Sequence, residues 1–370
     1  MPYKHFELPA YPCRSDMWDE LSRETRPIVV YGMGNGADKL IRRFKKYNIE
    51  ISDFFASDGF VRGHSFHGKR VKSFSEIREE YSEFVIVLSF ASNREEVLDM
   101  LEDIDTNYDM YVPDMPVADE FEYFDREFYN SNYDAIVEAY NSLEDEISRD
   151  VYSSVVNYKL SGRLSYLSAC WSTKDEVYAL LCSDRIRCAV DAGAYNGDTA
   201  REMKARFPYL KTIYALEPDA KNFKKLAKYC EAETEIKIIP LNAAAWCENA
   251  SGKFSVSGNR NSSVNSTASF EHVSRTVDLI RIDSLSHDRV DYIKYDIEGA
   301  EREALLGSRE AIERDEPNLL VSLYHRSRDL FSLVNMIRSE YPGYAMYIRR
   351  TRCIPAWEID LILTSKKETR

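Results

Sequence analysis

The chain has 370 residues, which is long enough for two or three domains of ordinary size. Its composition, with 44% hydrophobic and 30% charged residues, is that of a globular protein and excludes a disordered or fibrous chain. The net charge of −13, from 62 acidic and 49 basic residues, disfavours nucleic acid as a partner, because the surface would repel a phosphate backbone.

The seven cysteines include no CxxC pair, so the sequence indicates neither a disulfide framework nor a zinc site. The first twenty residues contain acids and prolines where a signal peptide needs an apolar core. No later window approaches the roughly 20 apolar residues of a membrane span. We therefore expect a cytoplasmic protein without a membrane span.

The first part of the chain alternates between strand and helix patterns. Residues 27–58 read as an apolar run, a glycine turn, an amphipathic helix and a second apolar run, which is a βαβ unit. An apolar run at 84–90 and a helical stretch at 94–104 continue the pattern. This predicts a smaller Rossmann-like α/β domain over residues 1–115.

The glycine turn of this domain, Gly32 to Ala37, matches the G-x-G-x-x-A pattern of dinucleotide-binding turns, with Asp58 about 20 residues further on. Such a turn could hold a pyrophosphate at the helix N-terminus. Glycines also suit any tight turn from a strand into a helix. Because no catalytic set follows in residues 60–115, we favour the purely structural interpretation.

Residues 116–185 show helical periodicity with few glycines and no convincing strand, which predicts a helical connector. From residue 186 to the end the strand pattern returns. The predicted strands are 186–191, 212–217, 236–241, 277–282, 292–296, 318–325, 344–350 and 357–365. Helical segments follow the first, second, fifth and sixth of them, which implies a mostly parallel sheet covered on both faces. The last two are too close for a crossover helix and should pair antiparallel at one edge.

Three features at successive strand ends of this C-terminal domain (186–370) suggest a ligand site. Asp191 precedes a glycine turn and can accept hydrogen bonds from a cationic amino-acid group such as the methionine part of S-adenosylmethionine. Glu217 ends the next strand and is placed for two ribose hydroxyls. Asn242 and Ala243 open a run of small residues beside which an adenine ring could lie flat.

A second group of polar residues follows later strands. Asp296 ends the predicted strand at 292–296, and Glu298 follows it closely. His325 ends the predicted strand at 318–325. All three should meet at the carboxyl edge of the sheet, where open α/β folds bind their ligands. They could form an acid–base set or hold a metal.

The segments VDAGAYNGDT, LEP, NAAAW, IKYDIEGAE and LYHR, in this order, resemble the FkbM family of S-adenosylmethionine-dependent methyltransferases. The resemblance implies a class I methyltransferase fold for residues 186–370 and O-methylation of a hydroxyl, often on a sugar. By the same resemblance Asp191, Gly193 and Gly197 are cofactor-loop residues, and Glu217 is the ribose ligand. Tyr195 departs from the glycine-rich loop that is common in methyltransferases.

The resemblance also places Asp296, Glu298 and His325 in the active centre. Histidine, with an ordinary pKa of about 6.5, is a better base at neutral pH than aspartate at about 3.9, so we favour His325 as general base with Asp296 beside it. The rival interpretation is a divalent metal held by Asp296, Glu298 and His325 that activates the acceptor hydroxyl. The sequence does not separate the two.

The segment 255–270 is rich in serine and asparagine. It predicts either a polar loop over the ligand site, suited to a small-molecule or glycan acceptor, or an ordinary surface hairpin.

Two other functions compete with methyl transfer. One is a nucleotide-sugar oxidoreductase or epimerase that uses the N-terminal glycine turn, which lacks a YxxxK-type pair. The other is a non-catalytic scaffold that only binds a ligand.

Overall fold

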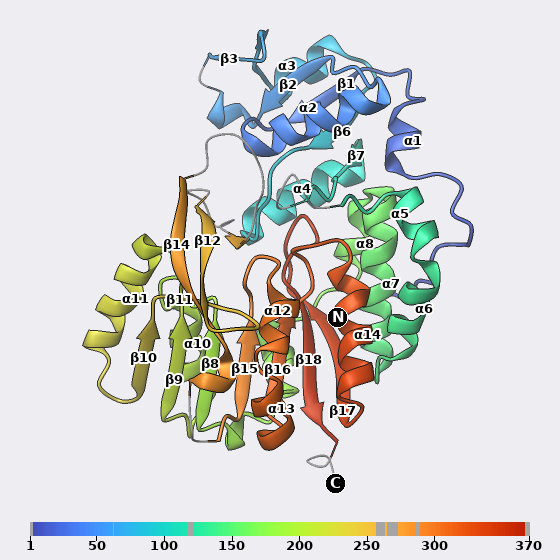
Figure 1. The fold of residues 1–370 in the computed structure, drawn as a ribbon. Helices are drawn as coiled ribbons and strands as arrows, with labels where there is room; N and C mark the ends of the chain where they lie inside the picture. Colours follow the sequence, from blue (N-terminus) through green and yellow to red (C-terminus); the bar gives the residue numbers. More distant parts are fainter. Residues whose placement is uncertain are drawn as a thin grey trace.

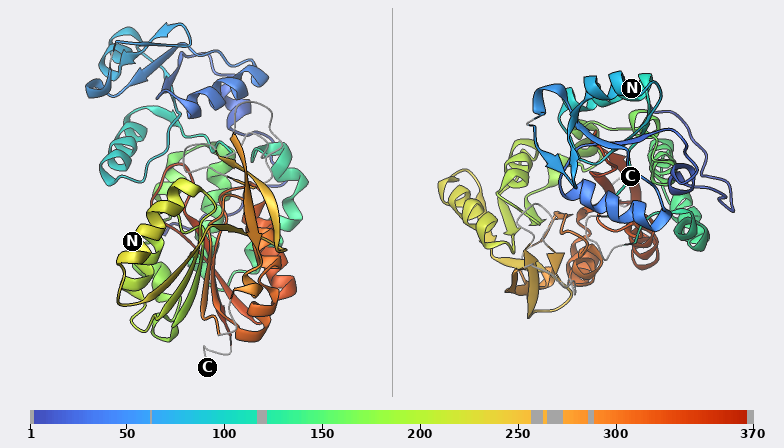
Figure 2. Two further views of the ribbon diagram at one scale, coloured as in Figure 1. Left: turned by 60° about the vertical axis from the view of Figure 1, so that its left-hand side comes forward. Right: turned by 90° about the horizontal axis from the view of Figure 1, so that it is seen from above.

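The computed structural model describes residues 3–61, 63–116, 122–256, 263–264, 273–285 and 289–366. The chain forms two α/β domains joined by helices, with the smaller N-terminal domain lying over one end of the larger sheet (Figure 1). Figure 2 shows the same arrangement after rotation. Among the described helices, none combines the length and the apolar character that crossing a membrane would need.

The N-terminal domain contains a parallel five-stranded sheet in the order β5-β2-β1-β6-β7. The bounds are β1 (Ile28–Tyr31), β2 (Asp53–Ala56), β5 (Lys72–Ser73), β6 (Val85–Leu88) and β7 (Asp109–Tyr111), with α1 (Met17–Leu21), α2 (Asn35–Tyr47), α3 (Phe74–Glu80), α4 (Glu95–Asn107) and the hairpin β3 (Ser65–Phe66) and β4 (Lys69–Arg70). Every residue of β1, β2 and β6 is buried, as expected for strands covered on both faces.

Packing accounts for two of the glycines in the first turn. A Cβ on Gly36 would lie 2.0 Å from the carbonyl oxygen of Ser89, at the end of β6. A Cβ on Gly32 would lie 2.8 Å from the Phe90 ring and from the Ser89 hydroxyl. These glycines therefore let α2 approach the neighbouring strand end, as the structural interpretation of this turn requires.

The segment between the domains is helical. It contains α5 (Arg126–Ser131), α6 (Tyr133–Asn141), α7 (Glu146–Ser161), α8 (Leu164–Ser168) and α9 (Lys174–Ala179). The apolar side of α7 is buried against β17, and α6 packs on α14. The connector thus covers one face of the C-terminal sheet and does not stand between the domains as a free linker.

A buried arginine ties the connector to that sheet. Arg350, at the end of β17, is 1% exposed. Its guanidinium donates to the carbonyl oxygens of Cys170 at 2.9 Å and of Cys353 at 3.0 Å, and also to that of Leu167. Several carbonyl acceptors replace the water that this buried cation has lost.

The C-terminal domain contains a seven-stranded sheet in the order β10-β9-β8-β15-β16-β18-β17. Its strands are β8 (Cys188–Ala192), β9 (Thr212–Leu216), β10 (Lys237–Leu241), β15 (Tyr292–Tyr295), β16 (Asn318–Ser322), β17 (Tyr344–Arg350) and β18 (Ile359–Ser365). Its helices are α10 (Asp198–Arg206), α11 (Ala220–Ala232), α12 (Glu301–Leu306), α13 (Arg309–Asp315) and α14 (Asp329–Glu340). Only β18 runs antiparallel, pairing with β16 and β17. The predicted mostly parallel sheet with an antiparallel edge pair is confirmed.

One of the predicted strands forms but belongs to a different sheet. Residues 277–282 were expected in the parallel sheet, but they overlap β14 (Val273–Ile280) of a separate four-stranded sheet in the order β11-β14-β12-β13. The other members are β11 (Ala243–Ala245), β12 (Ala250–Val256) and β13 (Ser263–Val264). No helix lies between β10 and β14 in the described residues, so the chain has no crossover to return it to the parallel sheet at that point.

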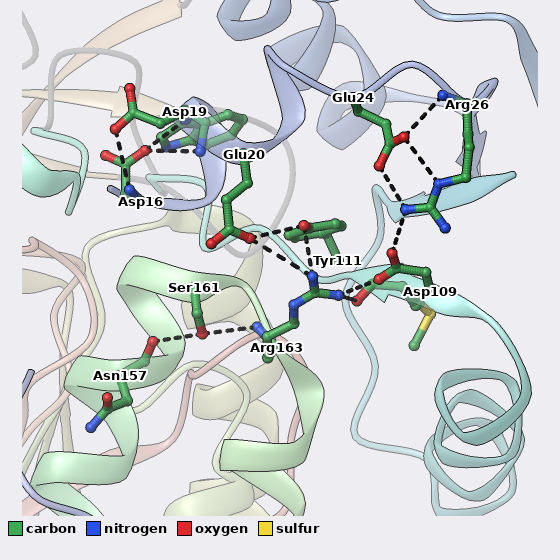
Figure 3. A network of polar contacts seen from close by, with 12 residues as sticks. Asp16, Asp19, Glu20, Glu24, Arg26, Asp109, Tyr111, Asn157, Ser161 and Arg163 are labelled. Atoms are coloured by element: carbon green, nitrogen blue, oxygen red, sulfur yellow. Dashed lines mark hydrogen bonds and ion pairs between the residues drawn. The ribbon is translucent and has the colours of Figure 1, made fainter. Parts of the chain in front are cut away.

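A polar network fixes the N-terminal domain to the connector (Figure 3). Asp109 on β7 accepts hydrogen bonds from Arg26 at 2.6 Å and from Arg163. The guanidinium of Arg163 also lies 3.8 Å from the ring centroid of Tyr111. A single cluster of buried hydrophobic residues runs from the N-terminal sheet through the connector to the C-terminal sheet. The two domains are therefore packed together.

Candidate active site

A cavity of about 720 Å³ opens at the carboxyl ends of β8, β9, β15 and β16. Of the residues predicted from the sequence, five line it: Gly193, Glu217, Ala243, Asp296 and Glu298. The other four, Asp191, Gly197, Asn242 and His325, are not among the lining residues; Asp191 and His325 are buried, whereas Asn242 is exposed. The sequence therefore located the cavity, while several side chains have other tasks than those expected.

Each glycine of the second turn allows a different neighbour to approach closely. Gly193 has φ +92°, and a Cβ there would lie 1.9 Å from the carbonyl oxygen of Asp296. Gly197 has φ +86° at the N-cap of α10, where a Cβ would lie 2.7 Å from the Tyr229 ring. Gly193 thus allows the ends of β8 and β15 to meet at the cavity, whereas Gly197 serves the packing of α10 against α11.

Asp191 is fully buried, and neither of its carboxylate oxygens has a hydrogen-bond partner in the structure. Burial raises the pKa of Asp191 to about 6, although the positive charge of Lys294 acts in the opposite direction. A buried carboxylate without hydrogen bonds is costly. Its position beside the positive charge of Lys294 shows that it favours a cationic neighbour; a role toward the cofactor remains a prediction.

Glu217 is 6% exposed and accepts backbone hydrogen bonds at both oxygens. The amide of Tyr195 donates to Oε2 at 2.9 Å, and that of Asp219 donates to Oε1 at 2.8 Å. Burial raises the pKa of Glu217 to about 7 despite these bonds. Each carboxylate oxygen keeps a further lone pair, so this orientation leaves room for two hydroxyl donors.

Asn242 holds the turn after β10 and does not reach into the cavity. Its side-chain amide donates to the carbonyl oxygens of Glu217 at 2.8 Å and Pro218 at 3.2 Å. The three alanines that follow, Ala243 to Ala245, are buried and line the cavity. A small apolar surface like the one expected for an adenine ring therefore lines the cavity, and Asn242 ties the start of this run to the turn after β9.

Asp296 is held between donors at the mouth of β15. Lys294 Nζ donates to Oδ2 at 3.0 Å, and the Tyr324 hydroxyl donates to Oδ1 at 3.0 Å. Burial raises the pKa of Asp296, but the charges of Lys294 and His325 outweigh it and lower the pKa to about 2. Asp296 is therefore a permanent carboxylate at neutral pH.

His325 lies among three carboxylates. Its Nδ1 is 2.8 Å from Glu301 Oε1, and its Nε2 is 3.4 Å from Asp296 Oδ1 and 3.7 Å from Glu298 Oε2. Burial lowers the pKa of His325, but the three acids outweigh this effect and raise it to about 10. These surroundings disagree with His325 as the general base, because an imidazole that keeps its proton at neutral pH cannot accept another.

Residues 191–344 match the family described as Methyltransferase FkbM domain. This part of the chain is an FkbM methyltransferase domain. The whole structure is similar to the crystal structure of Methyltransferase FkbM from Methylobacillus flagellatus KT, with a TM-score of 0.67 at 20% identity, over 91% of this chain and 90% of that chain. That likeness shows a shared fold across both domains.

Two further solved structures resemble about half of the chain more weakly. An rRNA methylase from Streptococcus thermophilus is 11% identical with a TM-score of 0.35, over 51% of this chain and 94% of that chain. TrmK from M. capricolum, in complex with S-adenosyl-homocysteine, is 11% identical with a TM-score of 0.32, over 53% of this chain and 69% of that chain. No curated protein matches the sequence.

The rival interpretation, a divalent metal held by Asp296, Glu298 and His325, does not fit the donors that the structure shows. Among the residues that the structure describes, no group of three or more His, Cys, Asp or Glu side chains is arranged to hold a metal ion. Both nitrogens of His325 face carboxylates, and a protonated imidazole has no lone pair to offer. Asp296 is likewise engaged by Lys294 and Tyr324.

Several residues of the site were missed by the sequence analysis. Glu301 belongs to the quoted IKYDIEGAE motif but received no role, and it is fully buried against His325. Lys294 and Tyr324 stand next to predicted residues. Glu358 and Asp360, at the start of β18, also line the cavity, and burial raises the pKa of Asp360 to about 8. The acids that open the last predicted strand were the available signal for these two.

The polar segment 255–270 cannot be placed relative to this cavity, because all of it except 255–256 and 263–264 lies outside the described residues.

Proposed function

We propose that the protein is an S-adenosylmethionine-dependent O-methyltransferase that acts on a hydroxyl of a sugar or glycan-like acceptor. The observation that carries the proposal is the acid-lined cavity itself. Glu217 and the alanines of β11 line one part of it, and Asp296 and Glu298 line another. Membership of residues 191–344 in the FkbM family supports methyl transfer as the reaction.

The residues of the cavity fit S-adenosylmethionine as the cofactor. Glu217 would accept the two ribose hydroxyls, and Ala243 to Ala245 would contact the adenine. Asp191, which is buried outside the cavity lining and has no hydrogen-bond partner, would attract the positive charge of the methionine part. When bound, the cofactor supplies a methyl group activated by a positively charged sulfur. The task left to the chain is to orient the acceptor hydroxyl and to remove its proton.

We assign the proton acceptor to Glu298. Its carboxylate lines the cavity, and burial raises its pKa to about 7, which is close to the value that suits a base at neutral pH. Asp296, kept ionised by Lys294, orients the acceptor hydroxyl. His325 retains its proton and balances the charges of Glu298, Glu301 and Asp296. With the cofactor bound, the acceptor oxygen would take the methyl group as the bond between that methyl and the sulfur breaks, and S-adenosylhomocysteine would be released. The proton of the acceptor hydroxyl would pass to Glu298 and then to solvent.

The alternatives receive no support from a specific contact. Two of the three glycines of the N-terminal turn, Gly32 and Gly36, are accounted for by Ser89 and Phe90, and Gly34 has φ +117° with open space beside it. The G-x-G-x-x-A pattern therefore has a structural reason that needs no dinucleotide. We propose that this domain makes no productive use of a nicotinamide.

Calorimetry with S-adenosylmethionine and S-adenosylhomocysteine tests the cofactor assignment. We expect Glu217→Ala to weaken binding of both by about 10- to 100-fold, since a hydrogen bond to a charged group contributes roughly 1.5–3 kcal/mol. Glu231→Ala, which removes an exposed acid of α11, is the matched control and should bind as the wild type does. An unaltered affinity in Glu217→Ala, or a wild type that binds neither molecule, would refute the assignment.

A further inference from the structure

The N-terminal domain contributes directly to the wall of the methyltransferase cavity. Asn93 precedes α4, Glu95 begins it and Leu98 lies one turn further, and all three line the cavity. They precede the FkbM domain by about a hundred residues and received no role in the sequence analysis. The cavity is therefore not complete within the FkbM domain alone.

The same part of the N-terminal domain is joined to the loop between β17 and β18. Ser92 and Ile354 exchange two backbone hydrogen bonds, of 2.8 and 2.9 Å. Arg352 pairs with Asp99 at 2.7 Å and with Glu102 at 3.0 Å, both on α4. Four residues of this loop line the cavity: Thr351, Arg352, Trp357 and Glu358. Residues from both domains thus form one fixed wall.

This wall lies apart from the proposed cofactor residues. Glu217 and Ala243 belong to the β9 and β11 part of the cavity, whereas Trp357 and Glu358 adjoin β18, next to β16 in the sheet. A bound cofactor would leave the second part for the acceptor. An indole and several carboxylate and amide groups, among them Glu95, Glu358 and Asn93, suit the C–H faces and hydroxyls of a carbohydrate.

The charges of the cavity further restrict the acceptor. Nine acidic residues line it against three cations, Lys174, Lys294 and Arg352. Each of the three already has a carboxylate partner. Lys174 pairs with Glu202 at 2.7 Å, and Lys294 pairs with Asp296. Arg352 pairs with Asp99 of α4. A phosphate placed here would meet surplus negative charge and would have to displace an existing ion pair.

We infer that the N-terminal domain and the β17–β18 loop together form the acceptor subsite, and that it selects an uncharged carbohydrate over a sugar phosphate or nucleotide-activated sugar. This inference rests on the proposed function. It assigns Asn93, Glu95 and Trp357 as residues that determine acceptor specificity, with no part in cofactor binding.

The experiment measures transfer of a labelled methyl group from S-adenosylmethionine to a library of neutral glycosides and oligosaccharides, and to the phosphorylated and nucleotide-linked forms of the same sugars. We expect neutral members to be methylated with at least tenfold higher kcat/KM than their charged counterparts. Glu95→Ala and Trp357→Ala should raise KM for the best neutral acceptor by about tenfold or more, while kcat and the affinity for S-adenosylhomocysteine stay near the wild-type values.

Glu96→Ala is the matched control, because Glu96 shares the first turn of α4 with Glu95 but does not line the cavity. It should leave KM unaltered. The inference is overturned if charged sugars are the better acceptors, if no neutral carbohydrate is methylated, or if Glu95→Ala and Trp357→Ala both keep the wild-type KM. If the wild type still binds S-adenosylhomocysteine and methylates some carbohydrate, only the inference about the acceptor subsite fails. A wild type that does not bind S-adenosylhomocysteine, or that methylates no carbohydrate of either kind, would refute the proposed function itself.

Discussion

At the scale of single residues, the chemistry of the site depends on how one histidine and three carboxylates share charge. Glu301 is fully buried, and Glu298 adopts φ +57°, a backbone conformation that side chains other than glycine rarely take. Strain of this kind persists where the surroundings enforce it, and it is common at active sites. Here it accompanies the carboxylate that lies between His325 and the cavity.

The rate of methyl transfer should report the ionisation of Glu298. With its pKa raised to about 7, the carboxylate is protonated below that pH and cannot accept a proton, so kcat/KM should fall about tenfold per pH unit below 7 and level off above it. Glu298→Gln should lower kcat by about 10²- to 10⁴-fold with cofactor affinity retained. A pH profile measured with the best carbohydrate acceptor checks both. A Gln variant as fast as the wild type would contradict this role.

The charge of His325 should appear in the stability of the fold. A histidine whose folded pKa is about 10, against an ordinary value of about 6.5, stabilises the protein fully below pH 6.5 and loses that contribution as the pH rises towards 10. His325→Gln leaves Glu301 buried without its counter-charge, which should cost about 3–5 kcal/mol at pH 6.5. Urea unfolding at pH 6.5 and 9.5 tests this, because the difference between variant and wild type should be smaller at the higher pH. An equal difference at both pH values would refute it.

At the scale of the elements, the glycine turn after β8 shows how a local conformation creates a site. Gly193→Ala would place a methyl group against the backbone of Asp296 in a φ range unfavourable to alanine. We expect a loss of about 1–3 kcal/mol in the free energy of unfolding, with weaker binding of S-adenosylhomocysteine because β8 and β15 must separate. Gly343→Ala, where a Cβ would meet open space at an ordinary φ, is the control and should be nearly neutral. Comparable unfolding curves for the two variants would show that this close approach is unimportant.

The elements also show which features a sequence reveals. The parallel strands were recognisable because their apolar runs alternate with helices, and the shortness of the segment before β18 indicated its antiparallel pairing. The displacement of β14 into a second sheet was not recognisable, since an alternating pattern does not say which strand is its neighbour. The same limit applies to side chains. Asp296 was expected from its place at a strand end, but its partners Lys294 and Tyr324 depend on the register of β15 and β16.

At the scale of the whole molecule, the domains prove more interdependent than their sequence patterns indicated. The helices predicted as a connector help to cover one face of the seven-stranded sheet. There α7 packs on β17, and α6 packs on α14. The participation of α4 in the cavity could not be expected from the sequence, because it results from the packing of two separately patterned domains. Contacts of this kind have no periodic signature in the chain.

The packing of α7 on β17 has a consequence for the order in which the chain is synthesised. The helix ends at Ser161, and β17 begins at Tyr344, more than 180 residues later. At about 5–20 residues per second, a ribosome needs roughly 10–40 s to make that interval. Throughout it, the valines and tyrosines that α7 finally buries have no sheet to cover them. For tens of seconds, therefore, the apolar residues of α7 are on a nascent chain that still lacks the strand against which they finally pack.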